Sequence, residues 1–372
     1  MESKHSFSAE DTRIIKGVAI LLMLFHHLLV SPDNYPYGTA FKTFISFNGT
    51  SLSYGISKFG NFCVSLFAFL GGYSIYKCYK KPHFFTNKLL TLYKNYWKIF
   101  FIFIPIGFIF FGNQAPHANA NYINNVYSHF EFKGFILNLI GINYTYNSEW
   151  WFFIFYVKAV FLGLIFIRVF EKNDSYYKEI LGIVVFIILL RLLYALGSIE
   201  TFSGVLKDDI ALIFQNHGNM ATVFMGIVFS KYNLLDRVIG WLHDLPLMAR
   251  KGLSILVIVA VFIYRYGMAM DYVLVPLFVT ALFELFGYSR VTRKGLGFLG
   301  KNSSNMYYTH TFYIFYFGAV AKLIYKPNNA IVCYIIFVAV CLVGSVLINK
   351  FYELCSKKIT IYNQRNSTEE AQ

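Results

Sequence analysis

Long apolar stretches recur along the whole chain and dominate its pattern of hydrophobic and polar positions. A helix needs about 20 mainly apolar residues to cross a lipid bilayer. Stretches of this kind predict ten spans, at residues 14–30, 59–76, 97–113, 150–169, 180–197, 210–229, 253–268, 270–287, 305–323 and 330–349. Most of them lack the polar outer face that a helix of a soluble protein presents to water. The predicted fold is therefore an all-α, polytopic transmembrane helix bundle.

The pattern also predicts how the rest of the chain is organised. The apolar segment 132–142 is too short to span, which favours a helix that lies in the membrane interface or re-enters it. The first span is followed by Ser31-Pro32-Asp33 rather than by a small-residue cleavage site, so we interpret it as an uncleaved helix. We expect residues 1–360 to form a single transmembrane domain and residues 361–372 a short polar cytoplasmic tail.

The composition and charge distribution agree with a membrane protein. With 57% hydrophobic and only 14% charged residues, the chain is too apolar for an ordinary soluble domain. The net charge of +14 is typical of nucleic-acid-binding proteins, but here the charge follows topology. If the N-terminus is cytoplasmic, 24 Lys and Arg residues fall in inside segments and 7 in outside loops. This is the positive-inside pattern, so we predict cytoplasmic termini and no nucleic-acid partner. The five cysteines are odd in number and imply no disulfide framework.

Ionisable residues within the spans are the candidates for chemistry, because burying them in a bilayer is costly. Rise along the helices places six at a similar, outward depth, namely His26, His27, Glu149, Arg191, His217 and Asp271, and places Lys158, Glu284 and His310 deeper. A polar layer of this kind indicates a site inside the bundle. The alternative is that such residues only hydrogen-bond neighbouring helices, and for Lys158, Glu284 and His217 it has equal weight. No metal site is predicted.

The first span carries a spaced pair, Lys16 followed by ten residues and then His27. This resembles the first helix of the acyltransferase-3 family, bacterial integral-membrane O-acyltransferases, in which a basic residue, usually Arg, precedes a His by the same interval. Three further segments resemble family motifs in the same order, at residues 62–73, 148–153 and 299–312. The chain departs from the family by Lys at 16, by Gly71 for a usual Ser, and by a loop at 88–97 that lacks most of the family's arginines.

The resemblance implies an activity and a set of roles. The donor would be a cytoplasmic acyl-CoA, most simply acetyl-CoA, and the acceptor a hydroxyl of a cell-surface or lipid-linked glycan at a bacterial plasma membrane. We predict that His27 is the general base or a transient acyl carrier, that Glu149 orients it or engages the sugar, and that Arg191 stabilises the oxyanion. The predicted substrate-binding residues are Lys16, His26, Trp150, Trp151, His217, Ser304 and His310. Among these, Lys16 would attract the CoA phosphates and the two tryptophans would stack on a sugar or anchor the helix in the interface.

Other classes of membrane protein remain open from the sequence alone. A transporter or exporter of a glycan precursor or acyl group would use the same polar layer, although we find neither the repeats nor the interrupted helices typical of transporters. A glycan polymerase would need more titratable groups than the external loop 112–149 offers, and the Lys16–His27 pair argues against an inert scaffold. The sequence also leaves open whether His26 or His27 is catalytic and whether the acyl group is acetyl or succinyl.

Overall fold

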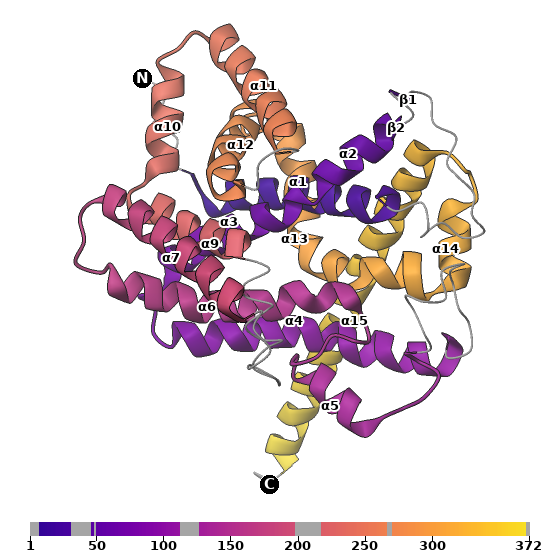
Figure 1. Cartoon of the computed structure of the whole chain (residues 1–372). Helices are drawn as coiled ribbons and strands as arrows, with labels where there is room; N and C mark the ends of the chain where they lie inside the picture. Colours follow the sequence, from indigo (N-terminus) through magenta and orange to yellow (C-terminus); the bar gives the residue numbers. More distant parts are fainter. Residues whose placement is uncertain are drawn as a thin grey trace.

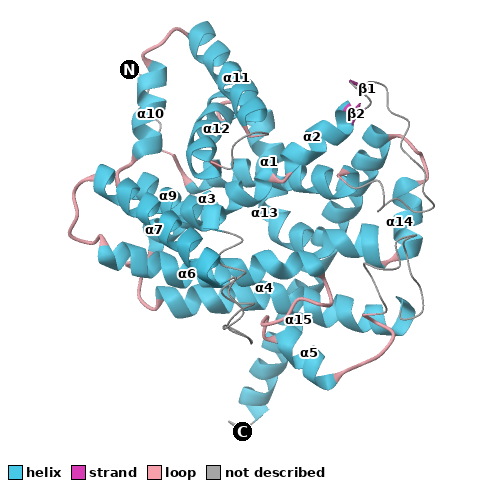
Figure 2. Ribbon diagram, in the orientation of Figure 1, coloured by secondary structure: helices cyan, strands magenta, loops and turns pink. Residues whose placement is uncertain are grey.

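The chain folds almost entirely into helices (Figure 2). The structure is a computed structural model that describes residues 7–30, 46–47, 50–111, 126–197, 217–265 and 270–369. Within these ranges the only strands are two-residue segments, β1 (Ser46–Phe47) and β2 (Thr50–Ser51), paired antiparallel. The helices are α1 (Ala9–Leu29), α2 (Leu52–Gly60), α3 (Phe62–Cys78), α4 (Phe84–Ile106), α5 (Phe132–Leu139), α6 (Trp151–Val169), α7 (Tyr176–Gly197), α9 (His217–Lys231), α10 (Leu234–His243), α11 (Leu247–Tyr264), α12 (Asp271–Phe286), α13 (Arg290–Thr311), α14 (Gly318–Tyr325) and α15 (Ala330–Glu369).

Six helical segments in the described part of the chain are long and apolar enough to cross a membrane. They are Ala9–Leu29, Leu52–Cys78, Phe84–Phe111, Ser148–Val169, Leu247–Tyr264 and Ala330–Ser356. The other four predicted spans overlap α7, α9, α12 and the end of α13. The all-α membrane bundle is thus confirmed, whereas the count of ten and the cytoplasmic termini stay predictions. α5 is too short to cross, and α15 continues as helix through most of the expected polar tail.

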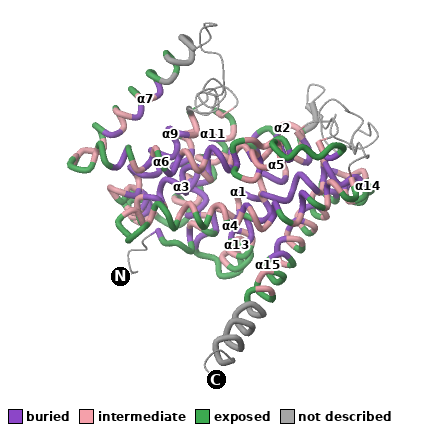
Figure 3. The backbone as a smooth tube through the Cα atoms, turned by 90° about the horizontal axis from the view of Figure 1, so that it is seen from below, coloured by how far each residue is buried: buried purple, intermediate pink, exposed green. Residues whose placement is uncertain are grey.

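The outer surface of the bundle is apolar. Large exposed hydrophobic side chains occur on α6, α7, α11 and α15, for example Phe161, Leu181, Leu256 and Ile335. Figure 3 shows α7 and α15 leaning away from the body, with exposed residues along the described part of each. A soluble monomer rarely exposes so much apolar surface, so these helices are suited to contact lipid.

Two helices far apart in sequence, α1 and α13, lie side by side in the middle of the bundle (Figure 1). A Cβ on Gly17 would lie 2.1 Å from the carbonyl oxygen of Leu296, and one on Gly300 would lie 1.9 Å from that of Arg13. The two backbones therefore touch, as small residues permit between membrane helices. Ten residues further along each helix, the rings of His27 and His310 meet. The contacts at both ends show that α1 and α13 run parallel.

α3 and α6 run in the opposite direction and complete the wall around this pair. Gly60, at the end of α2, packs on the backbone and Cβ of His26, so α3 begins beside the imidazoles and leads away from them. Further along α3, Gly71 faces the ring of Tyr156 on α6. α4 packs beside α6 and α13. These five helices, α1, α3, α4, α6 and α13, surround the candidate site.

Candidate active site

Two histidines and a glutamate meet where α1, α13 and the start of α6 converge. His27 Nε2 lies 3.6 Å from Glu149 Oε2, and the two side chains are 16% and 23% exposed. The ring centroid of His27 is 4.7 Å from that of His310, which is fully buried. The ring centroid of His26 also lies 5.0 Å from that of His27. The imidazole of His27 therefore faces both a carboxylate and a second imidazole.

The backbone around Glu149 is held firmly against α13. Glu149 lies in a short 3₁₀ turn, Ser148–Trp150, and its backbone N–H donates to the side-chain oxygen of Asn147 at 3.1 Å. The Asn147 amide donates to Thr311 Oγ1 at 2.6 Å. The hydroxyl of Tyr307 donates to the carbonyl oxygen of Glu149 at 2.7 Å. These bonds fix the position from which the Glu149 carboxylate reaches His27.

Hydrogen bonds to carbonyl groups define the tautomers of the two flanking histidines. His310 Nδ1 lies 2.6 Å from the carbonyl oxygen of Tyr307, and His26 Nδ1 lies 2.8 Å from that of Ser57. A carbonyl only accepts, so Nδ1 carries the proton in both rings. His310 Nε2 is buried and has no hydrogen-bond partner. It therefore presents a lone pair inside the cluster.

A cavity of about 240 Å³ lies next to this cluster. Tyr307, which hydrogen-bonds both Glu149 and His310, is one of its lining residues. It is lined by Lys16, Phe67, Gly71, Ser74, Lys88, Thr91, Leu92, Asn95, Phe152, Phe153, Tyr156, Ser303, Ser304, Tyr307 and Tyr308. The helix directions give the cavity two ends. Lys16, eleven residues before His27 on α1, and Lys88, near the start of α4, lie at what we call the lysine end. Phe67, Phe152 and Tyr307 lie nearest to the histidines, at the aromatic end.

The structure brings several of the predicted residues together, and it bears on which of His26 and His27 is catalytic. Lys16 and Ser304 line the cavity, while His27, Glu149 and His310 form the cluster beyond it. His26 turns towards α2, where it bonds Ser57, whereas His27 contacts the carboxylate. The geometry thus favours His27 over His26.

The structure does not bring every predicted residue into the cluster. Trp150 is only 1% exposed, packs against Tyr96 and Phe312, and donates its indole N–H to the Tyr308 carbonyl, so it has no ring face open to a sugar. Arg191 is exposed on α7, which packs on α9 and leans outward (Figure 3), so an oxyanion role for it has no support. Trp151, by contrast, is half-buried beside Phe155, and its indole N–H donates to the side chain of Glu149. His217 is the first residue of α9, and its side chain falls outside the described residues.

The depth estimate from sequence was wrong for His310. The span was expected to begin near residue 305, which placed His310 deep in the membrane. α13 begins instead at Arg290, so His310 lies near its far end, level with His27. Asp271 belongs to a separate group, where it accepts from Ser65 Oγ at 2.5 Å and from the guanidinium of Arg265 at 3.2 Å.

Sequence reasoning missed Tyr307, which connects the cavity with the cluster through its hydroxyl, its carbonyl and its ring. Its position three residues before His310, about one helical turn, was the available signal. From the sequence, Lys88 was only one of the 24 basic residues assigned to inside segments. In the structure its ammonium lies over the Tyr156 ring, 5.4 Å from the centroid, at the lysine end.

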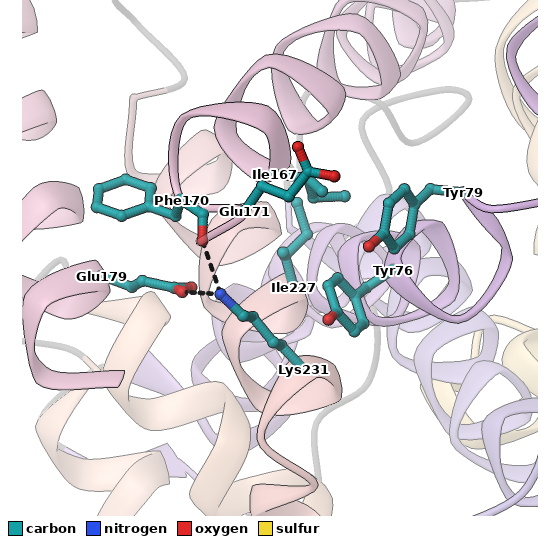
Figure 4. Close-up of a pocket in the computed structure, with 8 residues that line it drawn as sticks. All are labelled: Tyr76, Tyr79, Ile167, Phe170, Glu171, Glu179, Ile227 and Lys231. Atoms are coloured by element: carbon teal, nitrogen blue, oxygen red, sulfur yellow. Dashed lines mark hydrogen bonds and ion pairs between the residues drawn. The ribbon is translucent and has the colours of Figure 1, made fainter. Parts of the chain in front are cut away.

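Two other charged side chains, Lys231 and Glu284, link helices to one another. Lys231 donates to the carbonyl oxygens of Phe170 and Asn173 and to Glu179 Oε1, at 2.8, 2.7 and 2.5 Å, beside a cavity of only about 10 Å³ (Figure 4). Its three donors are therefore occupied, and they fasten the turn between α6 and α7 to α9. Glu284 is likewise surrounded by cations, with Arg250 Nε at 3.1 Å. Within the described residues, no group of three or more His, Cys, Asp or Glu is placed to hold a metal ion.

Comparison with known families agrees with this arrangement. The family model described as "Acyltransferase domain", of the acyltransferase-3 type, matches residues 12–350. That range includes the lysine end of the cavity, the histidine cluster and all six membrane-spanning segments at least in part. Searches of curated proteins and of solved structures found no match. Because the family model covers most of the chain, the protein belongs to the acyltransferase-3 family and is a membrane acyltransferase.

Proposed function

We propose that the protein transfers a short acyl group, most simply acetyl, from a cytoplasmic acyl-CoA to a hydroxyl of a cell-surface or lipid-linked glycan, at a bacterial plasma membrane. The observation that carries the proposal is the graded lining of the cavity, which leads from two lysines through polar side chains to aromatic rings and then to the His27–Glu149–His310 cluster. The charged end, the polar middle and the aromatic end correspond in order to the parts of an acyl-CoA.

The lysine end suits the phosphate groups of the donor. Neither Lys16 nor Lys88 forms an ion pair within the described part of the chain, so both ammonium groups are available to an anion. Along α4 towards the aromatic end, Thr91 and Asn95 follow Lys88 and offer hydrogen bonds to the amides of a pantetheine arm. From Lys16 to His27 the helix rises about 16 Å. An extended arm is needed to bridge such a distance, which favours CoA over a small acyl donor.

The histidine cluster suits base-catalysed acyl transfer. The acceptor hydroxyl gives its proton to the imidazole of His27 as its oxygen attacks the thioester carbonyl. The Glu149 carboxylate, 3.6 Å away, stabilises the imidazolium that forms. Collapse of the tetrahedral intermediate breaks the carbon–sulfur bond, and the proton passes from His27 to the departing thiolate, leaving CoA thiol and a glycan ester. His310, fixed by Tyr307, packs on the ring of His27 and holds it in this position.

Purified protein supplied with acetyl-CoA labelled in the acetyl group tests the proposal directly. We expect label to appear in a glycan fraction as an alkali-labile ester, with one CoA thiol released per ester formed. Parallel analysis of surface-glycan esters in cells with and without the gene would identify the acceptor. Release of thiol without glycan ester, or unchanged glycan esters in cells that lack the gene, would contradict a glycan acceptor.

The two lysines of the cavity give a prediction about donor binding. Replacing Lys16 or Lys88 by Ala removes a cation that the phosphates would meet, while the cluster beyond the aromatic end is left intact. We expect KM for acetyl-CoA to rise by roughly tenfold, the effect of losing about 1.4 kcal/mol of binding, with a smaller change in kcat. Lys301→Ala is the matched control, because this lysine is exposed on α13 and does not line the cavity. Equal effects at positions 16 and 301 would count against a phosphate site.

A further inference from the structure

The aromatic end of the cavity is lined by rings from three different helices. The Phe67 ring of α3 lies 6.4 Å from the Phe152 ring of α6, and Phe152 lies 5.9 Å from the Tyr307 ring of α13 in an edge-to-face arrangement. All three line the cavity. We call this set the aromatic gate.

The gate lies immediately before the reacting groups. Tyr307 precedes His310 by three residues, a rise of about 4.5 Å along α13. Its ring centroid is 6.2 Å from that of His310, and its hydroxyl is bonded to the backbone of Glu149. When the carbonyl of a thioester meets His27, it and the acyl carbons bonded to it therefore lie beside these rings.

The gate is also rigid. Tyr307 is held by hydrogen bonds at its hydroxyl and its carbonyl. Phe152 is packed against the Tyr156 ring at 6.2 Å, and Tyr156 is in turn confined by its close approach to Gly71. Rings supported in this way resist displacement by a longer chain, because overpacking a dense interior costs free energy.

We infer that Phe67, Phe152 and Tyr307 limit the length of the acyl group, so that the enzyme selects acetyl over longer acyl chains. The inference rests on the proposed transfer from acyl-CoA and adds to it the residues that determine donor specificity. Of the three, Phe67 is the best position to alter, because no hydrogen bond or catalytic contact depends on its side chain.

The test compares kcat/KM for acetyl-, propionyl- and butyryl-CoA in the purified full-length protein. In the unaltered protein we expect a fall of roughly tenfold or more from acetyl to butyryl, the size of discrimination that one or two methylenes provide in an apolar pocket. Phe67→Ala opens space next to Phe152, so the ratio of butyryl to acetyl transfer is expected to rise by roughly tenfold.

Two further variants keep the test decisive. Phe67→Leu removes part of the ring and serves if the alanine variant fails to reach the membrane, with a smaller rise in the same ratio. Phe161→Ala, on the same helix as Phe152 but 55% exposed on the outer surface, should leave the ratio unchanged.

The possible results distinguish a failure of the proposed acyl-length selection from a failure of the proposed acyl transfer. Acetyl transfer with an unchanged butyryl-to-acetyl ratio in both Phe67 variants would overturn the gate and leave the acyltransferase reaction standing. Equal use of acetyl- and butyryl-CoA by the unaltered protein would overturn it as well. Failure of the unaltered protein to use any acyl-CoA would instead overturn the proposed donor, and the gate with it.

Discussion

Replacing His27 by alanine is expected to lower acyl transfer by a factor of about 10²–10⁴, the contribution typical of a general acid–base group. The loss should appear in kcat, because His27 does not line the cavity that we assign to the donor. The measurement is the rate of labelled glycan-ester formation by purified protein. The side chain is partly exposed, so its removal should leave the amount of protein in the membrane unchanged.

His26→Ala is the matched control for this variant. The two imidazoles are neighbours in sequence and in space, but His26 bonds the backbone of Ser57, whereas His27 makes the 3.6 Å contact with Glu149. We expect the His26 variant to keep most of its activity and to lose some thermal stability. If the His26 variant loses transfer while the His27 variant keeps normal ester content, the assignment of the base is wrong.

The second large effect is expected at Gly300, where α13 touches α1. An alanine Cβ there would lie 1.9 Å from the carbonyl oxygen of Arg13 and 2.8 Å from its carbonyl carbon. Both atoms belong to backbone, so no rotamer change relieves the overlap and the helices must separate. We expect a loss of about 3 kcal/mol or more, at the upper end of overpacking effects, seen as a large drop in thermal stability in detergent.

Gly297→Ala gives a matched control on the same helix. A Cβ at this position meets no atom within 4 Å, and alanine is about 1 kcal/mol better than glycine within a helix. This variant should be as stable as the unaltered protein or slightly more so, with normal transfer activity. Similar melting temperatures for the Gly297 and Gly300 variants would show that the close approach of α1 and α13 does not support the fold.

The helical membrane fold was predictable because its signal is carried by long local stretches of apolar residues. The Lys16–His27 spacing was also readable, since both residues lie on one helix. What the sequence did not reveal is which helices meet. Neither the pairing of His27 with His310 nor the burial of Trp150 among aromatic rings follows from local pattern, because both depend on how α1, α4, α6 and α13 pack together.

The same limit explains the residues that were misplaced. Arg191 and His27 were grouped by estimated depth, but depth says nothing about which side of a helix faces the centre of the bundle. Arg191 is exposed on a peripheral helix, whereas Tyr307, an unremarked residue of an expected span, occupies the boundary between cavity and cluster. Tertiary packing, rather than residue type, decided these roles.

Because α1 and α13 are parallel and in contact, the active site depends on the number of residues between that contact and each histidine. Gly17 precedes His27 by ten residues, and Gly300 precedes His310 by ten residues. Because the helices touch at the two glycines, these equal intervals bring the two histidines to the same level. Adding or deleting one residue in either interval would swing that helix's imidazole by about 100° around its axis. Substitutions of side chains away from the contact are therefore compatible with the site. Insertions or deletions in either ten-residue interval are not, because they would separate the rings of His27 and His310.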